Sequence, residues 1–125
     1  MIRKLKNSFD LQLQWYKELL DLDRKMMSKL VLSRGDISVI ITGTETKNSL
    51  INKVQAERSN ACEMIELWQQ RKNEINSDDE ERTALDKIFE EIESVIGAFL
   101  REEDLLKKYI DGVLNLRTNL DDQDV

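Results

Sequence analysis

The chain has 125 residues, of which 40% are hydrophobic and 35% are charged, and it contains no proline and four glycines. This composition favours one domain built from few, long amphipathic helices, because a protein with many turns needs more proline and glycine. The net charge is −6, from 19 basic and 25 acidic residues, and this excludes nucleic acid as an expected partner, since phosphate binding needs a basic surface.

Secretion and membrane insertion are not indicated either. The single cysteine, Cys62, cannot form an internal disulfide, which favours a reducing compartment. The first residues lack the continuous apolar segment of a secretory signal, and no segment approaches the ~20 apolar residues of a membrane span. We therefore expect a cytoplasmic protein without membrane insertion, with frayed tails at about 1–8 and 118–125.

The first predicted helix starts near Ser8, which is a suitable N-cap, and ends before Gly35. Its apolar residues recur at steps of three and four in two neighbouring stripes, which together cover about half of the helix circumference. Asp23 occupies one place inside the first stripe. A helix that is apolar over so wide an arc needs two neighbouring helices or a partner to cover it.

The segment 37–43 has the composition of a strand but the context of a helix start. Its isoleucines and valine favour a strand, and Gly43 costs a helix about 1 kcal/mol relative to alanine. However, Asp36 stands at the N-cap position, and the chain contains no second alternating apolar run with which a strand could pair. Because apolar positions from Ile40 to Trp68 continue one helical face, we predict a second helix over about 37–75 that is weak or frayed over its first two turns.

The third predicted helix follows Ser77 and Glu80, which match a capping box. Apolar residues then keep the three-four spacing from Leu85 to Leu120, with Glu102 as the exception. About 36 residues of helix span about 54 Å. The sequence therefore predicts an all-α fold: an antiparallel bundle of three long helices, forming a single domain over 1–125, with the third helix long enough to extend beyond the bundle.

The residues that usually carry catalysis or bind metals are scarce. There is no histidine, and the glycines are scattered rather than grouped in a phosphate-binding loop. We therefore assign no catalytic residue, no metal site and no cofactor. Asp23, Lys47, Arg58 and Glu102 fall inside apolar stripes, where ion pairing or snorkelling explains them more simply than catalysis. A small all-helical enzyme that uses Arg58, Lys47 and Glu102 is the least favoured function.

One pattern reaches beyond the general description of a helical bundle. An apolar helix containing "WYKELLDLDRKM" is followed by Gly35, Asp36, Ile37, Ile40, Thr44, Glu45, Thr46, Lys47, Leu50, Ile51, Val54 and Arg58. This pattern resembles the FlgN-type flagellar export chaperones, and the similarity spans about Phe9 to Ile110. The FliT-type chaperones, which are similar in size, are the near alternative. The chain departs from the pattern at Gly43, where the family usually has a leucine.

The resemblance implies a bacterial cytoplasmic chaperone, without enzymatic activity, that serves type III secretion. Such a protein binds amphipathic helical termini of the flagellar hook-filament junction proteins, keeps them soluble, and docks at the export gate. The family binds its partners with the C-terminal amphipathic helix, which here maps to Val95, Phe99, Leu106, Tyr109, Ile110, Val113 and Leu114. The same stripe can instead form a homodimer or close a four-helix assembly, which makes a self-associating structural or adaptor module the alternative function.

Overall fold

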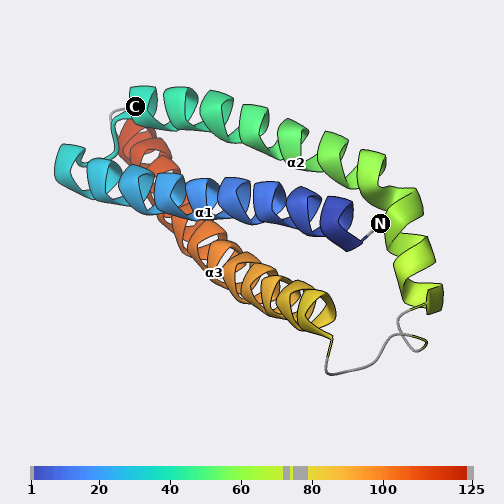
Figure 1. Ribbon diagram of the computed structural model, residues 1–125. Helices are drawn as coiled ribbons and strands as arrows, with labels where there is room; N and C mark the ends of the chain where they lie inside the picture. The colour runs from blue at the N-terminus through green and yellow to red at the C-terminus, as the bar shows by residue number, and fades with distance from the viewer. Residues whose placement is uncertain (1, 72–73, 75–78, 124–125) are drawn as a thin grey trace.

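The computed structural model consists of three long helices, α1 (Ile2–Ser33), α2 (Ile37–Arg71) and α3 (Glu80–Gln123). The structure describes residues 2–71, 74 and 79–123, and none of these lies in a strand. Figure 1 shows α1 between the other two helices in this view, with α2 on one side and α3 crossing behind it. The prediction of an all-α fold of three long helices is confirmed.

The turn between α1 and α2 follows from three consecutive residues. Arg34 and Gly35 adopt positive φ angles of 59° and 91°, and the Gly35 N–H donates to the carbonyl of Leu30 at 2.9 Å, which ends α1. Asp36 then caps α2, because its Oδ1 accepts from the backbone N–H of Ser38 at 2.9 Å. The segment 37–43 is therefore helical, as predicted, and the strand alternative is wrong. The expected weakness of its first two turns is not seen, because the helix is regular from Ile37 onward.

At Gly43 the backbone of α2 lies directly against a side chain of α1. A Cβ atom at this position would overlap the Sδ of Met26 and would lie 2.6 Å from its Cε and 2.8 Å from its Cγ. Met26 itself is buried, so its side chain packs directly on the backbone of α2. This contact explains why a leucine does not fit at the one position where the chain departs from the chaperone pattern.

The core runs along α1 as three clusters of buried residues. α1 is the central helix, because it contributes to every cluster and packs closely against both other helices. Within the described residues, the backbones of α2 and α3 do not approach each other closely. From the α1 N-terminus to the turn, the clusters are Leu5, Phe9, Leu13, Trp68, Leu85, Ile88 and Ile92; Leu19, Leu50 and Phe99; and Met26, Leu30 and Leu106.

The start of α1 differs from its prediction. Residues 2–8 are not frayed, because α1 begins at Ile2 and Leu5 is fully buried in the first cluster. Ser8 is therefore inside the helix rather than at its cap, and its Oγ accepts from the side-chain amide of Gln12 at 3.3 Å. The signal that was missed is Leu5, which continues the stripe of Phe9 and Leu13 by one turn.

The boundaries between α2 and α3 also shift. α2 spans Ile37–Arg71, and both its predicted end near residue 75 and Ser77 lie outside the described residues. The N-cap of α3 is Asp79, whose Oδ1 accepts from the backbone N–H groups of Glu81 at 2.9 Å and Arg82 at 3.1 Å. At its other end, α3 passes the α1–α2 turn at Val113 and remains helical to Gln123, within the tail predicted to fray.

None of the helices, over their described residues, is long and apolar enough to cross a membrane.

Candidate functional site

The predicted partner-binding stripe of α3 lies mainly against α1. Phe99 and Leu106 are buried in the second and third clusters, with 9% and 2% of their surfaces exposed. These two residues are therefore not exposed for a partner, because α1 covers them. Leu114 is exposed. The other members of the stripe are partly buried, namely Val95, Tyr109, Ile110 and Val113. Whether the stripe binds a partner stays a prediction.

Among the described residues, the most exposed large apolar side chain, Leu32, lies at the α1–α2 turn, outside the predicted stripe. Val31 and Leu32 at the end of α1 are 53% and 84% exposed, and Ile37 and Ile41 at the start of α2 are also exposed. A depression of about 560 Å³ lies beside them on α1 and α3; it is lined by Arg24, Met27, Ser28, Val31, Leu32 and Glu102. The run "LVL" before the turn was the sequence signal for an apolar surface here. Which of its residues are exposed depends on how α1 is rotated about its own axis, and only packing determines that rotation.

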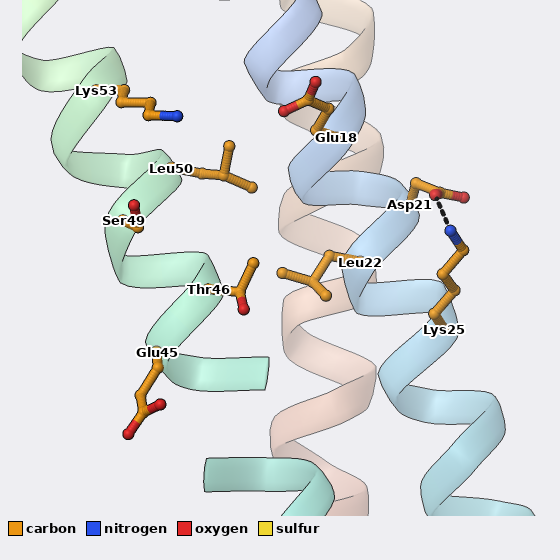
Figure 2. A pocket seen from close by; sticks show the side chains of 9 residues that line it. All are labelled: Glu18, Asp21, Leu22, Lys25, Glu45, Thr46, Ser49, Leu50 and Lys53. Atoms are coloured by element: carbon orange, nitrogen blue, oxygen red, sulfur yellow. Dashed lines mark ion pairs between the residues drawn. The ribbon is translucent and has the colours of Figure 1, made fainter. Parts of the chain in front are cut away.

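A groove of about 550 Å³ lies between α1 and α2. Figure 2 shows that Leu22 of α1 and Leu50 of α2 point into the gap between the helices, so the centre of the groove is apolar. Its rim is polar and carries both signs of charge; it consists of Glu18, Asp21, Lys25, Glu45, Thr46, Ser49 and Lys53. An apolar centre with charged edges is suited to one face of an amphipathic helix.

A second candidate site is a buried ion cluster to which each helix contributes one residue. The Lys47 Nζ of α2 lies 3.0 Å from Oδ1 of Asp23 on α1 and 2.6 Å from Oε1 of Glu103 on α3. The side chain of Asp23 is 0% exposed, that of Lys47 is 13% exposed and that of Glu103 is 34% exposed. We call these three residues the polar layer, because they interrupt the apolar core between its second and third clusters.

The charges of the polar layer do not balance when all three groups are ionised, because two carboxylates share one ammonium. Burial raises the pKa of Asp23 from 3.8 to about 7, the neighbouring Glu103 adds to the rise, and Lys47 opposes it. For Lys47, burial by itself lowers the pKa, but Glu103 and Asp23 outweigh burial and raise it, so Lys47 stays charged. The cluster therefore carries a titratable proton close to neutral pH.

Charge attraction, rather than directed hydrogen bonding, holds the carboxylates of the polar layer. Neither oxygen of Asp23 receives a well-directed hydrogen bond from the described residues, and neither does Oε1 of Glu103. Lys47 lies within ion-pair distance of both carboxylates but is not aligned with them. A proton shared by Asp23 and Glu103 satisfies one of these oxygens.

The sequence predicted two of the three members of the polar layer. Asp23 and Lys47 were recognised as polar residues within apolar stripes, and they do form an ion pair. Their third member is Glu103 rather than Glu102, which instead lies 3.7 Å from Arg24. Arg58 is exposed further along α2. The structure therefore does not bring Arg58, Lys47 and Glu102 together. The spacing from Phe99 to Glu103 to Leu106 was the signal that could have identified Glu103.

Metal binding is not supported by the described side chains, among which no three carboxylates or cysteines converge in a way that could hold an ion. Comparison of the chain with protein-family models, with curated proteins and with solved structures found no match. The groove and the polar layer are therefore interpreted from their own geometry, and the resemblance to export chaperones depends on the sequence pattern alone.

Proposed function

We propose that the protein is a bacterial cytoplasmic export chaperone of the FlgN type. In this role it binds amphipathic helical termini of flagellar hook-filament junction proteins, keeps them soluble before type III secretion, and delivers them to the export gate. The observation that carries the proposal is the groove between α1 and α2, which has an apolar centre and a charged rim. Glu45, Thr46 and Leu50 of its α2 wall also belong to the sequence pattern that resembles these chaperones.

A bound helix would complete the packing that three helices leave unfinished. Its apolar face lies over the partly buried Leu22 and the small exposed part of Leu50, while its flanking charges pair with rim residues such as Glu18 and Lys53. Client termini that are disordered when free gain order on binding, so their apolar face is shielded until export. The exposed Leu114 of the α3 stripe is accessible at once, whereas Phe99 and Leu106 become accessible when α3 separates from α1.

The groove is tested by blocking it. Fluorescence anisotropy with a labelled peptide of a junction protein's terminal helix measures the affinity of the wild type and of Ser49→Arg, which places a long cationic side chain in the groove. The neighbouring exposed Asn48, which does not line the groove, provides the matched control Asn48→Arg. We expect Ser49→Arg to weaken binding about tenfold or more, which is about 1.4 kcal/mol or more, and Asn48→Arg to have little effect. Equal affinities for the two variants would exclude the groove as the binding site.

Self-association is the second candidate function, and the exposed apolar side chains at the α1–α2 turn favour it. Leu32 is 84% exposed and has Val31 beside it, and apolar surfaces of this kind often mark contacts between proteins. Sedimentation velocity over a hundredfold range of concentration should then show a dimer that Leu32→Glu converts to a monomer. A wild-type protein that is monomeric over the whole range excludes this function.

A further inference from the structure

The polar layer is the only place, within the described residues, where charged groups of all three helices meet. Asp23 of α1 is fully buried there, and Glu103 of α3 shares its counter-ion, Lys47 of α2. Because one ammonium cannot neutralise two carboxylates, the ionised layer has one excess negative charge in the core. The burial of an uncompensated charge is unfavourable, so the layer is more stable with a proton, or with the carboxylates further apart, than in its fully ionised form.

We propose that the polar layer is a proton-operated latch: a proton shared by Asp23 and Glu103 holds α3 against α1, and its loss loosens α3 from α1. This role does not depend on the proposed chaperone function. Lys47 contacts both carboxylates from α2, so the repulsion that follows loss of the proton acts between α1 and α3. The two helices pack the stripe of Phe99 and Leu106 between them, and loosening them uncovers this stripe.

The other charged groups around the layer do not supply the missing positive charge. Arg24 on α1 lies 3.7 Å from Glu102 on α3, and both are more exposed than Asp23. On α3, Asp104 is paired with Lys108 at 2.9 Å. Lys107 lines a small cavity of about 280 Å³ beside Lys47 and Glu103 but is itself exposed. Lys47 is therefore the cation that pairs with Asp23 and Glu103, and the excess negative charge of the ionised layer stays on these two carboxylates.

The direction of the pH effect follows from the titration of Asp23. Burial raises its pKa to about 7 in the folded protein, whereas an unfolded chain has an aspartate pKa of about 3.9. Between these two values the folded state binds the proton and the unfolded state does not. The free energy of unfolding therefore falls as the pH rises through this window, and the contribution of Asp23 levels off above the folded pKa. For a single proton, the unfolding equilibrium constant changes by up to about tenfold per pH unit.

The linkage is tested by urea unfolding between pH 4.5 and 8.5, comparing the wild type with Asp23→Asn. Asparagine has a similar shape and does not titrate, so we expect this variant to lose most of the decrease in stability between these pH values. Asp21→Asn is the matched control, since Asp21 is an exposed carboxylate on the same helix that pairs with Lys25. If Asp23→Asn does not fold, Glu103→Gln replaces it, because removing Glu103 leaves Asp23 paired with Lys47 alone. If the stability of the Asp23→Asn or Glu103→Gln variant depends on pH as strongly as that of the wild type, the proposal is overturned.

Movement is tested separately, because a titrating residue need not move a helix. Spin labels at Lys29→Cys on α1 and Arg101→Cys on α3, two exposed positions, report the separation of the helices in a Cys62→Ser background. Between pH 5.5 and 8.5 we expect the distance distribution to lengthen or broaden in otherwise wild-type protein and to stay constant when Asp23→Asn is added. A distribution that does not change with pH in the wild type overturns the latch even if Asp23 titrates.

Discussion

The contact between Gly43 and Met26 shows how a single residue sets the distance between two helices. Gly43 is a poor helix former, yet it is buried in α2 opposite the thioether of Met26. The absence of a side chain allows a long, flexible side chain of α1 to pack on the α2 backbone. The glycine therefore has a packing role that propensity scales, which count only its cost to the helix, do not include.

Substitution of Gly43 tests this packing role. Gly43→Leu should destabilise the protein by about 1–3 kcal/mol, the usual cost of overpacking a core, because Met26 must leave its place. Gly43→Ala should change stability less, since the atoms in the way belong to the mobile end of Met26 and alanine favours the helix. Urea denaturation measures both values, and Met26→Ala should rescue part of the leucine defect. A stable Gly43→Leu protein would show that the helices are free to separate here.

The cap of α2 is a second test at the level of one residue. Asp36 accepts from both the backbone N–H and the hydroxyl of Ser38, and the β-branched residues that follow it are poor helix formers. Asp36→Ala should therefore cost about 0.5–2 kcal/mol, the range observed for N-caps. Thermal unfolding followed by circular dichroism measures the loss. Asp36→Asn, which keeps the cap, is the control and should remain close to the wild type.

At the level of the element, α3 has a covered face and an exposed face, so that adjacent residues can lie on different faces. Phe99 is buried against Leu19 and Leu50, whereas its neighbour Leu100 is 59% exposed. The apolar stripe identified in the sequence is thus the face that holds α3 on α1. A stripe that packs within a monomer and a stripe that binds a partner have the same spacing, so the sequence could not distinguish the two.

Two neighbouring alanine substitutions separate these faces. Phe99→Ala should destabilise the protein by about 3–5 kcal/mol, as expected for a buried aromatic residue, because a cavity opens between α1, α2 and α3. Leu100→Ala should change stability by no more than about 0.5 kcal/mol, which is typical of surface positions. Urea denaturation of the two variants gives the comparison directly, and similar losses for both would contradict the orientation of α3.

At the level of the whole molecule, the position of α1 between the other helices explains why the fold was predictable and the binding surface was not. Helix number, order and the turn at Gly35 follow from periodicity and from one glycine–aspartate pair. The start of α1 was missed because Leu5 is buried by Trp68 and Leu85, which are distant in sequence. The prediction named Glu102 where the structure has Glu103. Adjacent residues on a helix point in directions about 100° apart, and only the packing of the helix shows which of the two faces the core.

The polar layer joins all three helices, so its removal should affect the whole molecule. Lys47→Met leaves Asp23 and Glu103 facing each other without a counter-ion and should destabilise the protein by about 3–5 kcal/mol, as breaking a buried ion pair does. The defect should grow as the pH rises, because Lys47 lowers the pKa of Asp23 in the wild type and the variant lacks the charge that stabilises the ionised carboxylate.

Replacing the whole layer gives the control for that prediction. The combined change Asp23→Leu, Lys47→Met and Glu103→Leu should recover most of the lost stability, since well-packed apolar groups can replace a buried ion cluster at no net cost. Urea denaturation at pH 6 and pH 8 measures both variants. A triple variant as unstable as Lys47→Met would mean that the layer contributes packing that leucine cannot reproduce.

The central place of α1 also has a consequence for synthesis on the ribosome. Residues at both ends of α1 pack against residues that are translated last. Leu5 shares a cluster with Leu85, and Leu30 shares a cluster with Leu106, so neither cluster is complete before α3 is made. The α1–α2 hairpin can form as soon as α2 has emerged, because the cap at Asp36 and the contact at Gly43 involve only these two helices. The face of α1 that α3 covers then remains exposed to solvent until most of α3 has been translated. A nascent chain stalled near residue 75 is therefore the state most at risk of aggregation.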